Sequence, residues 1–203
     1  RENFPIEWGK YGVIDYAKSD LANVHNDFHL YRLARFGVLP SSGTCALAEA
    51  QCMPYVQYNS SLIVVPPYSK NSILLPSVLT YGDSKKMCSI ANQVRHNIEY
   101  GVNIPPGIKT HFQSVTGEDI LNAVLELETL VDDWTPRSEL QQRWGNVNRE
   151  LWEGKTIWEG IDEAPMIAAE DVGNRIKTES LYVFSESRVA QQFLHNHQDL
   201  LFE

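Results

Sequence analysis

The sequence lacks long apolar runs, and basic residues are few. The longest apolar stretches lie near residues 61–67 and 73–79, well short of the roughly 20 residues that a membrane-spanning helix requires. Lysine and arginine total 17 against 26 acidic residues, which gives a net charge of −9 over 203 residues. We therefore expect no membrane span, and no strong binding to nucleic acid, because such binding depends on a basic surface that contacts phosphates.

Cysteine is also scarce, and its spacing fits neither a metal site nor a disulfide framework. The three cysteines are Cys45, Cys52 and Cys88, an odd number for a secreted disulfide-bonded protein. No glycine-rich turn from a strand into a helix offers a cradle for a phosphate group. We therefore predict a reducing, intracellular environment and no metal or other cofactor.

The acidic residues are concentrated in the second half of the chain. Residues 1–101 carry 9 basic and 8 acidic side chains, whereas residues 102–203 carry 8 basic and 18 acidic ones. Such asymmetry usually reflects a solvated acidic face, and less often a face that binds a basic partner.

Apolar spacing predicts seven helices that together cover about half of the chain. Residues 84–101 repeat apolar side chains at helical intervals from Met87 onward and end at a glycine. Residues 116–131 open with Thr116 and Asp119 in the pattern of a capping box. Thr135 and Pro136 have the residue types of a helix start. The other predicted helices cover residues 19–37, 44–52, 135–151, 165–177 and 187–202.

Strand-like segments are shorter, and prolines interrupt several of them. Because proline cannot donate to a strand ladder, we assign these segments to sheet edges or extended loops. We predict one domain over residues 1–203, mostly α with a minor β or extended excursion (α+β), built on a helical body of about seven helices. Residues 55–82 are predicted to protrude as an extended or hairpin segment. The chain starts at Arg1 rather than Met, which fits a fragment of a longer product. The strand-like segments are residues 11–16, 61–65, 73–75, 78–81, 109–115 and 181–184.

Cys45 is the strongest catalytic candidate. The preceding Ser-Ser-Gly-Thr would place its thiol at a helix N-terminus, where the macrodipole lowers the pKa of a thiol. His111 follows on a predicted strand, and this order resembles the layout of papain-like and cell-wall amidase cysteine enzymes. The tryptophan and glycine patterns of those families do not surround Cys45, and the neighbouring alanines favour a buried, inert thiol.

His25 and His29 are spaced one helical turn apart, so both imidazoles could face one metal ion. Position 26 is Asn, whereas the metalloprotease pattern requires a Glu there as the general base. We therefore interpret both histidines as ordinary polar or solvent-facing side chains and predict no metal site.

Four of the five tryptophans fall within 25 positions, between Trp134 and Trp158. Trp144 belongs to an apolar helical stripe, which predicts that it is buried. Trp134, Trp152 and Trp158 are predicted to form an interface, since aromatic residues with charged neighbours are common where protein chains meet. Ordinary core packing is the alternative for each of them.

These observations favour a non-enzymatic, self-associating structural protein, for example a viral coat or capsid-type subunit. Its predicted partners are further copies of itself or other protein chains, and its predicted location is the cell interior (cytoplasm) or a virion. One alternative is a cysteine hydrolase that uses Cys45 and His111. Another alternative is an acidic adaptor or effector domain that binds a basic protein partner.

Overall fold

The computed structural model describes residues 6–60, 71–82, 86–89, 93, 109–133, 135–152 and 188–200. Within these residues the chain forms five α-helices and seven strands, which are arranged in two sheets. The helices are α1 (Val24–Leu33), α2 (Gly43–Ala50), α4 (Gly117–Asp132), α5 (Glu139–Trp152) and α8 (Gln191–Asn196).

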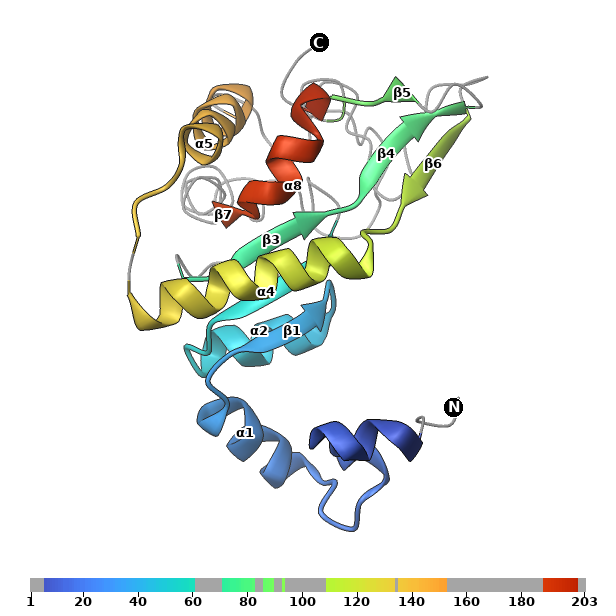
Figure 1. The fold of residues 1–203 in the computed structure, drawn as a ribbon, viewed down its shortest axis with the longest axis vertical. Coiled ribbons are helices and arrows are strands. Elements are labelled where there is room, and N and C mark those ends of the chain that lie inside the picture. Colours follow the sequence, from blue (N-terminus) through green and yellow to red (C-terminus); the bar gives the residue numbers. More distant parts are fainter. Residues whose placement is uncertain are drawn as a thin grey trace, which may run out of the picture.

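The larger sheet is entirely parallel and forms the centre of the molecule (Figure 1). Its strands, in spatial order, are β1 (Gly37–Pro40), β2 (Tyr55–Ser60), β3 (Ile73–Pro76) and β7 (Arg188–Val189). All four residues of β3 are buried. Parallel sheets are generally covered on both faces, so an interior strand such as β3 has buried side chains on both sides.

Helices cover both faces of this sheet. Tyr55 of β2 packs with Cys45 and Ala48 of α2, whereas the next residue, Val56, belongs to the main core cluster with Leu127 of α4. Successive residues of a strand point to opposite faces, so α2 and α4 lie on opposite sides of the sheet. The core around α4 also includes side chains from β3, β7, α5 and α8.

The smaller sheet is antiparallel and consists of β5 (Lys86–Met87), β4 (Val78–Tyr81) and β6 (Thr110–Gln113). The chain passes from β3 directly into β4 through Ser77, whose N–H donates to the carbonyl oxygen of Ser60 at 2.8 Å. The two sheets are therefore joined by nearly continuous backbone.

The start of α4 is determined by local polar contacts. The hydroxyl of Thr116 accepts from the N–H of Asp119 at 3.1 Å, and the Asp119 carboxylate accepts from the N–H of Thr116 at 2.9 Å. These reciprocal bonds form the predicted capping box, which satisfies two backbone donors that the helix leaves free. The prediction of this helix is confirmed.

The predicted seven-helix body is wrong, because the described residues form a mixed α/β structure around two sheets. The error has a physical cause. The strand-like segment at residues 73–75 was assigned to a sheet edge or an extended loop because of its neighbouring proline, whereas it forms the interior strand β3. Residues 55–60 were included in the predicted extended excursion, whereas they form the interior strand β2.

The predicted protrusion of residues 55–82 is also wrong for the part of it that the structure describes. β2 pairs with β1 and β3, and β3 pairs with β2 and β7, so both are interior strands. Pro76 is the last residue of β3, where the lack of an N–H donor does not interrupt the ladder.

Several predicted helices differ from the structure at their ends. Met87 belongs to strand β5, so the helix predicted from residue 84 does not begin there. The fifth helix begins at Glu139, after the predicted start at Thr135 and Pro136. Arg188 and Val189 form β7 ahead of α8. Residues 165–177 lie outside the described part of the chain.

Trp144 is buried as predicted, with 2% of its surface exposed. In the part of the chain that the structure describes, no helix combines the length and the apolar character needed to cross a membrane.

Candidate interaction surface

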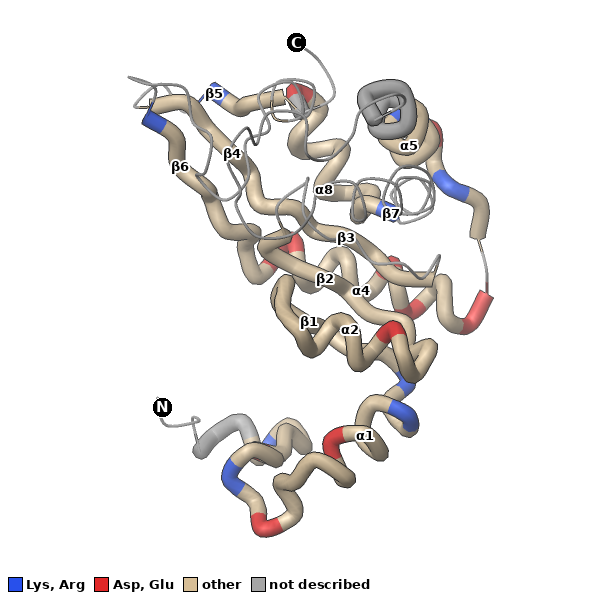
Figure 2. The backbone as a smooth tube through the Cα atoms, turned by 180° about the vertical axis from the view of Figure 1, so that it is seen from behind, with Lys and Arg blue, Asp and Glu red and all other residues tan. Residues whose placement is uncertain are grey.

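Residues 6–34, here called the N-terminal arm, extend away from the rest of the molecule. The arm contains the 3-10 turns η1 (Ile6–Tyr11) and η2 (Tyr16–Lys18) followed by α1. Both views place it beyond the β1 edge of the larger sheet, with its first turns far from the core (Figures 1 and 2). None of the residues of α1 is buried.

Polar contacts give the arm a defined shape without a core of its own. The hydroxyl of Tyr16 donates to the carboxylate of Asp27 at 2.7 Å and accepts from the N–H of Asn23 at 3.1 Å. The side-chain oxygen of Asn23 accepts from the N–H of Asn26 at 3.0 Å and so caps α1. The arm is therefore locally ordered although no residue of α1 is fully buried.

The arm exposes many large apolar side chains. Val24 and Phe28, one helical turn apart on α1, are 67% and 47% exposed, and Leu33 is 80% exposed. Single exposed apolar residues are ordinary, whereas a group of them on one projecting element indicates a surface that binds another molecule. The other exposed apolar residues of the arm are Tyr11, Val13, Ile14, Leu21 and Leu30.

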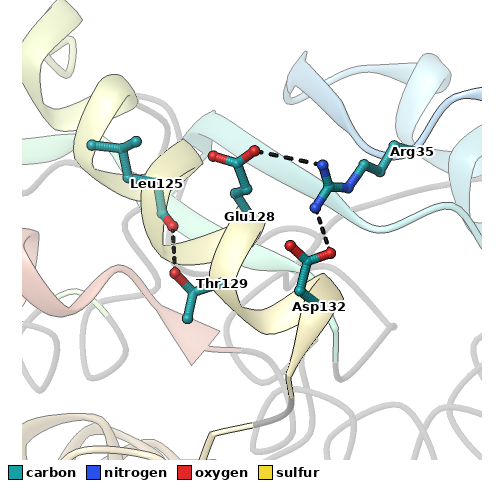
Figure 3. A network of polar contacts seen from close by, with 5 residues as sticks. All are labelled: Arg35, Leu125, Glu128, Thr129 and Asp132. Carbon is teal, nitrogen blue, oxygen red and sulfur yellow. Dashed lines mark hydrogen bonds and ion pairs between the residues drawn. The ribbon is translucent and has the colours of Figure 1, made fainter.

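The base of the arm is fastened to the body. Tyr31 packs against the small core cluster between α2 and β2. Just after the arm, Arg35 forms ion pairs with Glu128, at 3.6 Å, and with Asp132, both on α4 (Figure 3). The N–H of Gly37 then donates to the carbonyl of Pro54 at 2.9 Å as β1 begins. The exposed part of α1 is thus held at one end.

The α4 ridge, defined as Leu121 and Leu125, is a second exposed apolar feature. These residues are 56% and 52% exposed, although Ala123 and Leu127 on the opposite side of the same helix are fully buried. Carboxylates lie one turn beyond the ridge at each end, Glu118 on one side and Glu128 on the other. The helix carries no lysine or arginine.

The structure places the two candidate catalytic residues on different elements, Cys45 on helix α2 and His111 on strand β6 of the smaller sheet. Cys45 is buried in α2, and its thiol donates to the carbonyl oxygen of Pro40 at 3.2 Å. Burial raises the pKa of this thiol, in spite of its place near a helix N-terminus. His111 is exposed on β6, opposite Thr80 of β4. Among the described residues, no hydrogen bond joins Cys45 to His111.

The paired histidines of the arm, His25 and His29, are both exposed on α1. Within the described ranges, no three His, Cys, Asp or Glu side chains gather closely enough to hold a metal ion.

The predicted tryptophan interface is not tested by the structure. Trp134 and Trp158 lie outside the described residues, and only the backbone of Trp152 is described, at the end of α5. That interface stays a prediction.

Sequence reasoning did not identify the arm as a surface. Leu21, Val24, Phe28 and Tyr31 repeat at helical spacing, and we interpreted that stripe only as a sign of helix. One available signal was that Leu30 and Leu33 put further apolar side chains on the opposite side of the same short helix. A helix that is apolar on two sides needs more than one covering surface.

Comparisons with known proteins leave the function to be inferred from these surfaces. No protein-family model, no curated protein and no solved structure matches the chain significantly.

Proposed function

We propose that this protein is a non-enzymatic structural subunit that associates with further copies of itself through its N-terminal arm. The observation that carries the proposal is α1, an ordered helix with no buried residue and with Val24, Phe28 and Leu33 exposed. A projecting element of this kind gains its apolar burial when it lies against another chain. A coat or capsid-type subunit is one concrete form of such a protein.

The energetics require that several arm residues be buried together. Complete burial of one large apolar side chain contributes about 1.5–3 kcal/mol. Association costs on the order of 4–15 kcal/mol in lost translational and rotational freedom. Two or three such side chains therefore contribute about 3–9 kcal/mol, which falls below or within that cost, whereas the eight exposed apolar residues of the arm contribute about 12–24 kcal/mol when all are buried.

The alternative functions have weaker support. A cysteine hydrolase requires an accessible thiolate, and burial raises the pKa of Cys45. An acidic adaptor would bind a basic partner through carboxylates such as Glu118, but outward acidic residues are also the usual means of keeping a helix solvated. Neither alternative explains the exposed apolar side chains of the arm.

Light scattering coupled to size-exclusion chromatography, over a wide range of protein concentration, tests the proposal. The wild-type protein is expected to form oligomers, and the double variant Val24→Ser/Phe28→Ser is expected to be a folded monomer. The matched control is His25→Ser/His29→Ser, which changes two exposed polar residues of the same helix and should leave association unchanged. A wild-type protein that stays monomeric at every concentration would contradict the proposal.

A further inference from the structure

We infer that α1 of one copy binds to the α4 ridge of a second copy, with the two helices antiparallel. This inference rests on the proposed function, because it assumes that the arm mediates association. It adds the identity of the surface that receives the arm.

The apolar residues of the two helices match in spacing. Val24 and Phe28 are separated by four residues on α1, and Leu121 and Leu125 are separated by four residues on α4. Rows of side chains at this spacing are the ridges that interlock when two helices pack. The four side chains are each about half exposed or more, and this exposure already takes account of both helices of the same chain. The arm of the same chain therefore does not cover the ridge, which leaves it accessible to a second copy.

The charges at the ends of the two apolar pairs are complementary. Arg32 lies one turn beyond Phe28 on α1, and Glu118 lies one turn before Leu121 on α4. Both side chains are exposed, and within the described part of the chain neither forms an ion pair. Opposite charges across an interface favour the correct orientation of two partners.

These charges determine the relative direction of the helices. In the antiparallel arrangement Phe28 lies over Leu121, and Arg32 then reaches Glu118. In the parallel arrangement Arg32 would approach Glu128, whose carboxylate already pairs with Arg35 of its own chain. Only the antiparallel arrangement pairs a free cation with a free carboxylate.

The fastening of the arm is compatible with this contact. The ion pairs of Arg35 with Glu128 and Asp132 lie at the far end of α4 from Glu118. The base of the arm can therefore stay attached to its own α4 while a second arm occupies the ridge. When the α1 helix of each copy binds to the α4 ridge of the other about a twofold axis, the contact is made twice and the assembly is closed.

A charge-exchange experiment on the full chain tests the inference. Arg32→Glu and Glu118→Arg are each expected to weaken self-association, measured by sedimentation equilibrium, by about tenfold or more. The double variant Arg32→Glu/Glu118→Arg should recover most of the wild-type association, because the opposite charges face each other again. Far-UV circular dichroism confirms that each variant is folded.

A matched control separates the interface effect from an effect on the helix. Glu118→Arg removes a favourable acidic residue from the first turn of α4, and Glu139→Arg makes the same change in the first turn of α5. Glu139→Arg should leave association unchanged. As a second test of the ridge that reverses no charge, Leu125→Ser should also weaken association.

The outcomes distinguish the inference from the proposed function. If Val24→Ser/Phe28→Ser abolishes association while Glu118→Arg and Leu125→Ser do not, the arm binds elsewhere, and only the inference is wrong. A double charge variant that associates no better than either single variant would also overturn it. A monomeric wild-type protein would overturn both.

Discussion

Glu126 provides the sharpest test of how the described elements are held together. One oxygen of its carboxylate accepts from the side-chain amide of Gln141 at 2.7 Å, and the other accepts from the N–H of Gln191 at 2.8 Å. The same amide of Gln141 donates to the carbonyl of Val189 at 2.9 Å. One carboxylate thus links α4 to α5, β7 and the start of α8.

Replacing Glu126 with leucine is expected to destabilise the protein by about 2–4 kcal/mol. The buried amide of Gln141 keeps its bond to Val189 but loses its second acceptor, and leaving a buried donor unsatisfied costs about 1–3 kcal/mol. The N–H of Gln191 is exposed and can bind water, so it adds little. The loss of attraction between Glu126 and Arg188, a buried cation, supplies the remainder.

The pH dependence of the free energy of unfolding provides a second, independent test of the role of Glu126. Burial raises the pKa of Glu126 above its ordinary value of 4.5, against the opposing effects of its hydrogen bonds and of Arg188. The folded protein therefore retains a proton at pH values where the unfolded chain has lost it. The resulting contribution to stability is fully present below pH 4.5 and is lost as the pH rises through the raised pKa. The free energy of unfolding of Glu126→Gln, which stays neutral, should accordingly rise relative to wild type over that range.

Urea denaturation monitored by tryptophan fluorescence, repeated across this range of pH, measures both effects. Glu139→Leu and Glu139→Gln, at an exposed position of α5, are the matched controls. If Glu126→Leu unfolds at the same urea concentration as Glu139→Leu, the carboxylate does not link these elements. If the stability of Glu126→Gln falls relative to wild type as the pH rises, the burial argument is refuted.

Two further predictions concern packing and thiol reactivity. Leu127→Ala should lower the free energy of unfolding by about 3–4 kcal/mol, because removal of the fully buried side chain leaves a cavity. Leu125→Ala, two positions away and half exposed, should lower it by less than about 1 kcal/mol. Urea denaturation of dilute protein measures both values. Equal costs would contradict the assigned faces of α4. Iodoacetamide should label the exposed Cys52 faster than the buried Cys45, as followed by peptide mass spectrometry at neutral pH. Faster labelling of Cys45 would restore the hydrolase hypothesis.

The sequence by itself determined those elements whose signals are local. The capping box of Thr116 and Asp119 involves residues three apart, and the buried side of α4 follows from residues within a few turns. Trp144 was correctly predicted as buried because its helix places apolar residues on one side. Contacts between near neighbours in the chain can be inferred without knowledge of the fold.

Only the tertiary structure decided the sheets. β3 lies between β2 and β7, and its partner residue Arg188 is more than a hundred positions away from Ile73. Parallel strands need long connections, so no turn motif between neighbouring strands reveals their pairing. Residues 73–75 were recognised as strand-like, but their place in the interior of the sheet depends on β2 and β7, which the local sequence does not specify.

The tertiary structure also decided the candidate sites. The local sequence placed Cys45 near a helix N-terminus, which favours a thiolate, but packing against Ala48, Met53 and Tyr55 buries the thiol and raises its pKa. The stripe of Val24 and Phe28 predicted a helix, and only the position of that helix beyond the sheet showed that the stripe is exposed. Periodicity specifies which side of a helix is apolar, whereas the presence of a covering surface depends on residues that are distant in the chain or that belong to another molecule.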